Sequence, residues 1–143
     1  MLFRSVSQRI MSVAAPLMIL CDTNILIEFY KNNPQISQTF RDVGKNELAI
    51  SVITEAELYF GALNKAELQM IQRHLSSLQR FGLDAAVSNQ FLQLMETYSL
   101  SHKLSIPDAL IAATALVHNL ELFTLNLKDF RFIPGLTLFN PEK

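Results

Sequence analysis

Short apolar runs alternate along the chain with segments in which apolar residues recur at helical spacing. The run at 17–21 leads directly into the polar sequence Asp-Thr-Asn, which is typical of a buried parallel strand that ends at a strand-to-helix turn. Runs of this kind predict strands at 17–21, 48–52, 121–124 and 136–139. Periodicity and capping residues predict helices at 25–30, 34–43, 54–63, 68–78, 84–99 and 105–116.

This alternation predicts an α/β protein with three α/β/α layers and a mostly parallel central sheet, because right-handed crossovers place helices on both faces. Ligands of such sheets bind beyond the carboxyl ends of the strands. Asp22 directly follows the first predicted strand, and Glu57 follows the second by about one helical turn. We therefore expect both carboxylates at the same edge of the sheet.

The composition fits one well-packed domain. The chain has 143 residues, of which 50% are hydrophobic and 17% are charged. We assign residues 17–143 to this domain and residues 1–16 to a loosely ordered N-terminal extension or a mis-assigned start. The net charge of -1 gives no bulk basic field of the kind that binds nucleic acid, so any contact with RNA has to be local.

The cysteine content and the N-terminal sequence favour a cytoplasmic location without membrane insertion. Cys21 is the single cysteine, so no internal disulfide can form, and no Cys/His spacing resembles a zinc site. The apolar run at 10–20 resembles a signal peptide. However, Pro16 interrupts it and no small-residue cleavage site follows, so we interpret its end as part of the first strand.

Asp22 has two interpretations. It lies between a predicted strand and a predicted helix, where an aspartate commonly serves as the N-cap of the helix. A carboxylate at the end of an apolar strand is also costly unless its charge is compensated, and a bound cation compensates it strongly. We favour the functional interpretation.

Glu57 and Asp108 have structural alternatives of their own. Thr54 and Glu57 have the spacing of a capping box, and Asp108 lies in a first helical turn, where the helix dipole favours any acid. Glu55 is a rival to Glu57 but lies on another side of the predicted helix. Three acids near helix starts would repel one another unless a divalent cation lay between them, and hard oxygen ligands select Mg²⁺ or Mn²⁺.

Four sequence segments form an ordered set: LCDTNILI at 20–27, SVITEAEL at 51–58 with Gly61, PDALIAA at 107–113, and TLN at 124–126 with Asp129 and Phe130. This set resembles the PIN-domain family and, more narrowly, the VapC-type toxins of toxin–antitoxin pairs. The resemblance extends from about Met18 to the end of the chain. It implies a metal-dependent endoribonuclease that forms a homodimer and is blocked by a cognate antitoxin.

Carried over residue by residue, the resemblance assigns Asp22 and Asp108 to the metal and makes Glu57 the second acid of the family. At the fourth position many members have aspartate, whereas this chain has Asn126, so a second metal would be held less firmly. Asp129 either substitutes for that acid or caps a turn. We expect Glu57 to position or deprotonate a water, and neighbouring groups to orient carboxylates and substrate: Thr23, Asn24, Thr124 and Asn126.

Two other functions fit parts of this pattern. A haloacid-dehalogenase-type phosphatase also has an aspartate after its first strand, but Asn24 occupies the place of its second aspartate. A catalytically decayed PIN-like module that binds only protein is a different class, and Asn126 is the best argument for it. Binding of a divalent metal distinguishes such a module from an enzyme.

Overall fold

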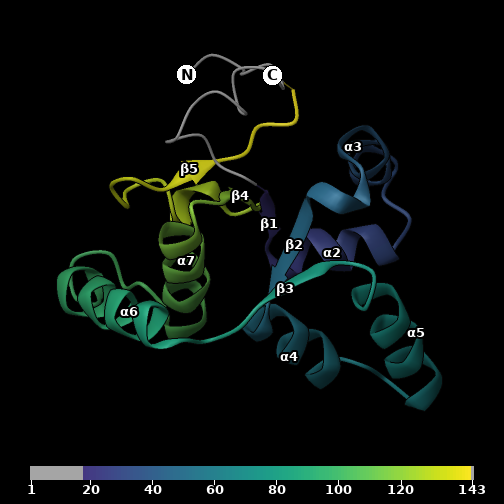
Figure 1. Ribbon diagram of the computed structural model, residues 1–143, viewed down its shortest axis with the longest axis horizontal. Helices are drawn as coiled ribbons and strands as arrows, with labels where there is room; N and C mark the ends of the chain where they lie inside the picture. The colour runs from purple at the N-terminus through teal and green to yellow at the C-terminus, as the bar shows by residue number, and fades with distance from the viewer. Residues whose placement is uncertain (1–17, 143) are drawn as a thin grey trace.

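The computed structural model of the chain describes residues 18–142, which form a parallel sheet with helices on both faces (Figure 1). The strands lie in the order β3-β2-β1-β4-β5, and every pairing between neighbours is parallel. Their bounds are β1 Ile19–Cys21, β2 Leu48–Ser51, β3 Gln79–Phe81, β4 Glu121–Phe123 and β5 Thr137–Leu138. The predicted α/β class is confirmed, and the sheet is parallel throughout rather than mostly parallel.

Helices connect the strands in chain order, as crossovers between parallel strands require. The α-helices are α2 Thr23–Tyr30, α3 Pro34–Val43, α4 Val52–Phe60, α5 Lys65–Leu75, α6 Ala85–Tyr98 and α7 Ile106–His118. Two short 3₁₀ helices, η1 Lys45–Glu47 and η2 Leu127–Asp129, lie before β2 and after β4.

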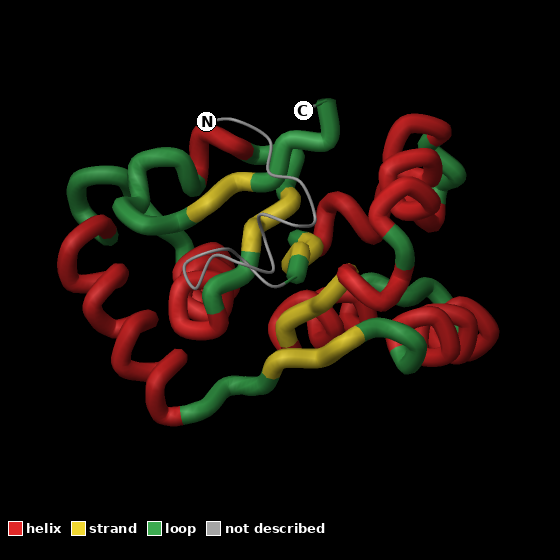
Figure 2. The backbone as a smooth tube through the Cα atoms, turned by 45° about the horizontal axis from the view of Figure 1, so that its top comes forward, coloured by secondary structure: helices red, strands yellow, loops and turns green. Residues whose placement is uncertain are grey.

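The central strand β1 contributes side chains to both hydrophobic cores, because successive residues of a strand point to opposite faces. Leu20 belongs to the cluster that includes Ile111 of α7. Ile19 and Cys21 belong to the other cluster, with Ile25 of α2. Figure 2 shows the strands between these two groups of helices, which confirms the three layers.

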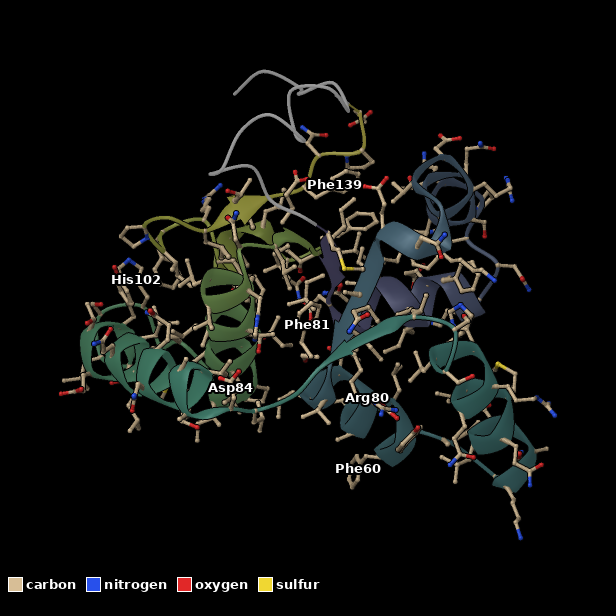
Figure 3. The ribbon with its side chains drawn as sticks, in the orientation of Figure 1. Phe60, Arg80, Phe81, Asp84, His102 and Phe139 are labelled. Atoms are coloured by element: carbon tan, nitrogen blue, oxygen red, sulfur yellow. The ribbon has the colours of Figure 1, made fainter. Side chains whose placement is uncertain are left out.

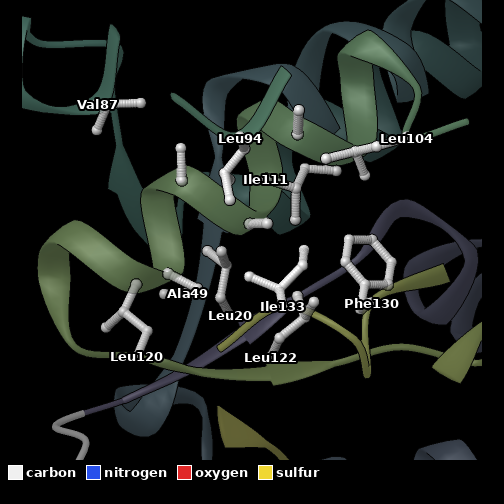
Figure 4. Close-up of a cluster of buried hydrophobic side chains, with 14 residues drawn as sticks. Leu20, Ala49, Val87, Leu94, Leu104, Ile111, Leu120, Leu122, Phe130 and Ile133 are labelled. Atoms are coloured by element: carbon white, nitrogen blue, oxygen red, sulfur yellow. The ribbon is translucent and has the colours of Figure 1, made fainter. Parts of the chain in front are cut away.

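Helix α7 packs directly against the sheet through small side chains. Ala109, Ala112 and Ala113 are fully buried, and α6 packs along α7 from the side. Figure 4 shows this core, in which Leu20 and Leu122 of the sheet lie beneath Ile111. The close fit of α7 fixes the position of its N-terminal turn beside the carboxyl end of the sheet.

One strand and several helix boundaries differ from the sequence predictions, among them those of α5, which spans Lys65–Leu75 where 68–78 was predicted. The strand β3 was not predicted, because its sequence Gln-Arg-Phe is polar and lies at an edge of the sheet. Helix α4 begins at Val52, two residues before the predicted start, and its N-cap is Ser51, whose Oγ accepts a hydrogen bond of 3.2 Å from the backbone N–H of Thr54. The structural alternative for Glu57, a capping box with Thr54, is therefore not formed.

The proposed N-terminal extension at 1–16 lies outside the described residues, and so do Leu17 and Lys143 of the assigned domain 17–143. No helix formed by residues 18–142 has the length and apolar character that a membrane crossing requires.

Candidate active site

Asp22 lies at the carboxyl end of β1 and begins α2. Its Oδ1 accepts a hydrogen bond of 2.8 Å from the backbone N–H of Thr23, so Asp22 is the N-cap of α2. Its own N–H donates to the carbonyl oxygen of Phe123 at the end of β4 (2.9 Å). The side chain is only 5% exposed. Asp22 thus has the N-cap role of the structural alternative, and its carboxylate is buried at the predicted edge of the sheet.

The loop after β4 is joined to this carboxylate. Thr124 donates a hydrogen bond of 2.8 Å from Oγ1 to Oδ2 of Asp22. The N–H of Asn126 donates to the same Thr124 oxygen (3.1 Å), and the N–H of Leu125 donates to Oδ1 of Asn24 (3.3 Å). Thr124 and Asn24 therefore orient the site as expected from the sequence, whereas Asn126 is exposed and contributes its backbone.

Glu57 reaches this edge from α4. Its Oε1 accepts a hydrogen bond of 2.6 Å from Oγ1 of Thr23, which directly follows Asp22. The hydroxyl oxygen of Thr54, a fully buried residue one turn before Glu57, lies 3.2 Å from that of Thr23. Thr54 thus supports the site rather than capping the helix. Its place on the same flank of α4 as Glu57 was the sequence signal for this role.

Asp108 lies in the first turn of α7, where the N-cap Ser105 accepts a hydrogen bond of 3.2 Å from its backbone N–H. The carboxyl group is partly buried. The pKa of Asp108 is raised to about 6, chiefly because of burial, and the negative charge of Asp22 contributes to this rise. Asp129 and Glu57 make smaller contributions to it, while the hydrogen bond with Ser105 opposes them.

The pKa of Asp22 is shifted in the same direction. Burial raises it, and the hydrogen bonds from Thr124 and Thr23 lower it in part. The charges of Glu57 and Asp129 raise it again. No basic side chain of the described chain is among the groups that shift the pKa of Asp22 or Asp108.

Glu57 and Asp129 therefore raise the pKa of both Asp22 and Asp108, and Asp22 raises that of Asp108. Within residues 18–142, no three or more His, Cys, Asp or Glu side chains form a group that could hold a metal ion. Asp129 is partly buried at the end of η2 and influences both Asp22 and Asp108. Asp129 therefore contributes a negative charge to this edge of the sheet, whereas the side chain of Asn126 is uncharged.

Glu55, the rival acid on α4, has a different environment. It is only 6% exposed, and Arg80 of β3 binds it with two hydrogen bonds, of 2.5 Å from Nε and 2.8 Å from Nη2. Tyr59 donates a further hydrogen bond from its hydroxyl. Figure 3 shows Arg80 reaching from β3 to α4. Glu55 is fully engaged away from Asp22, as its side of the helix predicted.

A cavity of about 340 Å³ lies beside Glu57 between α2, α4 and α5. Its wall includes Ile27 and Met70, and its charged residues are Lys31, Glu57 and Glu67. A second cavity of about 530 Å³ shares Met70 and Tyr30 with the first and extends to α3. Of the candidate-site acids, only Glu57 lines either cavity, and we call the first cavity the groove between α2, α4 and α5.

The fold and the site define a three-layer α/β/α protein with an acidic cluster at the carboxyl end of a parallel sheet. The family model described as the PIN domain matches residues 19–135 of the chain. The chain therefore belongs to the PIN-domain family.

Within the PIN-domain family, the chain is similar to a VapC ribonuclease and to chains of toxin–antitoxin complexes. The chain is 34% identical over 115 residues to the protein named Ribonuclease VapC10 of Mycobacterium tuberculosis, and the match covers 79% of this chain and 86% of the relative. Among solved structures, a toxin–antitoxin complex from Klebsiella pneumoniae has a chain with 35% identity and a TM-score of 0.73, covering 86% of this chain and 97% of that one. VapBC2 from Rickettsia felis, bound to a DNA fragment from its promoter, has 30% identity, a TM-score of 0.74 and coverages of 86% and 98%.

Proposed function

We propose that this chain is the toxin of a toxin–antitoxin pair, an endoribonuclease that uses Mg²⁺ or Mn²⁺ to hydrolyse phosphodiester bonds in RNA. The observation that carries the proposal is the burial of Asp22 among further acids with no basic group to offset them in the described part of the chain. Such an arrangement is costly in the free protein and becomes favourable when a divalent cation binds. The similarity to Ribonuclease VapC10 supports RNA as the substrate.

Carboxylate oxygens are the kind of donor that a hard divalent cation prefers. Asp22 and Asp108 are the residues that would hold it, with Glu57 and Asp129 close enough to add their charge. Each oxygen of Asp22 accepts one hydrogen bond from the protein and keeps a second lone pair free. A bound Mg²⁺ or Mn²⁺ would supply acidity to a water and neutralise charge on the phosphate oxygens.

The protein groups around the acids have separate tasks. Thr23 holds Oε1 of Glu57, which leaves Oε2 to accept the proton of the attacking water. Thr124 fixes one oxygen of Asp22 and the α2 backbone fixes the other, so the carboxylate cannot turn. Asn24 holds the loop that begins after β4, and with it the approach to Asp129.

The antitoxin would bind the groove between α2, α4 and α5. The apolar wall with Ile27 and Met70 suits an apolar protein segment, and Glu57 at its border suits a basic side chain that reaches the acids. In two solved structures of such systems, a toxin–antitoxin complex and VapBC2, the matched chain shares this fold over 97% and 98% of its length. A homodimer and a cytoplasmic location are further parts of this proposal, and a size measurement in solution tests the first.

Asn126 is the one observation that favours the alternative, a module that binds protein but has lost catalysis. Its side chain supplies no charge at a position where many family members have aspartate. Asp129, three residues after Asn126, supplies a fourth acid, because its charge raises the pKa of both Asp22 and Asp108. The missing charge at Asn126 is therefore a weak argument for loss of catalysis. We therefore favour the enzyme.

Incubation of the purified chain with single-stranded RNA tests the proposal. We expect cleavage with Mg²⁺ or Mn²⁺, none with EDTA, and none when Asp108→Asn replaces the wild type. Asp42→Asn, an exposed acid on α3, is the matched control and should cleave normally. Calorimetry that detects no divalent-metal binding, together with absence of cleavage, would establish the protein-binding alternative.

A further inference from the structure

Three aromatic rings form a cluster where the loop after α6 meets the loop after η2. The imidazole of His102 stacks on Phe132 with ring centroids 4.1 Å apart and an interplanar angle of 14°. Tyr98 lies edge-on to both rings, at 5.4 Å from His102 and 5.0 Å from Phe132. Oγ of Ser101 lies 2.8 Å from Nδ1 of His102, which fixes the orientation of the imidazole.

This cluster lies at the surface and has a local positive charge. His102 is exposed at the end of α6, and Figure 3 shows it at the periphery of the molecule. Lys103 and Arg131 are each the chain neighbour of a ring in the stack. Both are exposed and neither has an ion pair within residues 18–142. The stretches 97–107 and 130–139 contain no acidic residue.

The same two loops adjoin the helices that carry two acids of the candidate active site, Asp108 in α7 and Asp129 in η2. The loop after α6 ends at Ser105, the N-cap of the helix turn that contains Asp108. Phe132 follows Asp129 by three residues, so their Cα atoms lie at most about 11 Å apart. The ring cluster is therefore close to the acids, while the apolar groove between α2, α4 and α5 lies on other helices.

We propose that the His102–Phe132 stack, with Lys103 and Arg131, binds an unpaired nucleotide of the RNA that is cut at the acids. A base would stack on the open face of the imidazole, and the two cations would bind the phosphates on either side. This inference rests on the proposed function and adds a substrate-binding element to it. Exposed rings with nearby cations and no acid in the same loops fit a single-stranded polyanion better than an apolar protein segment.

A binding experiment separates this role from catalysis. The Asp22→Asn protein, which should not cleave, is titrated with a short single-stranded RNA that carries 2-aminopurine, whose fluorescence falls on stacking. We expect His102→Ala in this background to weaken binding between about 5-fold and 150-fold and to abolish the fluorescence change. His102→Phe keeps a stacking ring and should restore both.

A second variant tests the charges. Removing the positive charges of Lys103 and Arg131 together should reduce the slope of log affinity against log salt by about 0.7 for each phosphate that the protein no longer neutralises. The matched control removes Lys45 and Arg73, two exposed cations elsewhere on the surface, and should leave the slope unchanged. Thermal unfolding of every variant shows whether the stack also holds the two loops together.

The outcomes are distinct. Unchanged RNA affinity and fluorescence in His102→Ala, with or without a lower unfolding temperature, would reduce the stack to a packing interaction and overturn the inference. Wild-type cleavage that requires metal would leave the proposed function intact in that case. Absence of RNA binding by the Asp22→Asn protein would overturn the inference directly, while absence of cleavage by the wild type would count against the function.

Discussion

Asp22 and Glu55 are both buried acids, at 5% and 6% exposure, yet their surroundings shift their pKa values in opposite directions. Burial raises the pKa of Glu55, but the hydrogen bonds from Arg80 and Tyr59 and the charge of Arg80 outweigh it and lower the pKa overall. For Asp22, burial raises the pKa and the hydrogen bonds from Thr124 and Thr23 do not offset it.

The difference teaches how to separate a structural acid from a functional one. Glu55 receives its positive partner from the protein itself, so its charge is already compensated when the chain folds. Asp22 has acids around it where Glu55 has a guanidinium, and no basic side chain of the described residues is among the groups that shift its pKa. Burial alone would have ranked the two residues equally.

The largest expected effect separates the two acids by activity. We expect Asp22→Asn to reduce metal-dependent RNA cleavage by about 10³-fold, because the variant loses a metal ligand while it keeps its shape. Glu55→Gln should change the cleavage rate by less than about 5-fold, since Glu55 faces away from the site. Initial rates with excess Mg²⁺ measure both. Full activity of Asp22→Asn would remove the distinction.

The second effect separates the acids by stability. We expect Glu55→Gln to lower the free energy of unfolding by about 2 kcal/mol, because it removes the partner of Arg80 and weakens two charge-assisted hydrogen bonds. Asp22→Asn should leave it unchanged or raise it, because it removes a charge that other acids repel. Urea unfolding without metal measures both, and a larger loss for Asp22→Asn would reverse the comparison.

The third effect is the pH dependence of stability. The folded-state pKa of Asp108 is raised from 3.8 to about 6, so the folded state holds this proton more tightly than the unfolded state does. Without metal, this group should favour folding below about pH 4 and lose its contribution as pH rises through about 6, a change on the order of 2 kcal/mol.

Glu55 has the opposite sign, because its folded-state pKa is lowered, and its contribution is lost as pH falls through its own titration. Urea unfolding of Asp108→Asn and Glu55→Gln across about pH 2–8 isolates the two contributions. Mg²⁺ should stabilise the wild type above about pH 6 and lose this effect below it. A Mg²⁺ effect that grows as pH falls would contradict the assignment of Asp108.

The sequence predicted the positions of the acids well, because hydrophobic periodicity determines where strands end in a parallel sheet. The run before Asp22 had the pattern of a buried strand, and its carboxyl end meets that of the next strand at one edge. The helix at 34–43 was predicted with its observed bounds, since Pro34 and Gly44 are strong start and stop signals.

The partners of the acids were less predictable, because they depend on contacts between distant segments. The Arg80–Glu55 pair joins residues 25 positions apart through a strand whose polar sequence gave no strand signal. The hydrogen bond from Thr23 to Glu57 spans 34 positions, whereas the local spacing of Thr54 and Glu57 indicated a capping box. Local patterns cannot decide between a side chain that caps its own helix and one that reaches another.

The smallest expected effect tests the hydrogen bond that distinguishes Glu57 from Glu55. Thr23→Val keeps the volume of the side chain but removes the donor to Oε1 of Glu57, so this carboxylate is free to rotate. We expect cleavage to slow about 10-fold, as for loss of a group that orients a catalytic residue, with metal affinity reduced less. Thr23→Ser should restore the rate, because it restores the hydroxyl.

Thr39→Val on α3, which loses only a hydrogen bond to the carbonyl of Gln35, is the matched control. Equal rates for Thr23→Val and the wild type would mean that Glu57 needs no support from α2, and the case for Glu57 as the residue that handles the attacking water would weaken accordingly.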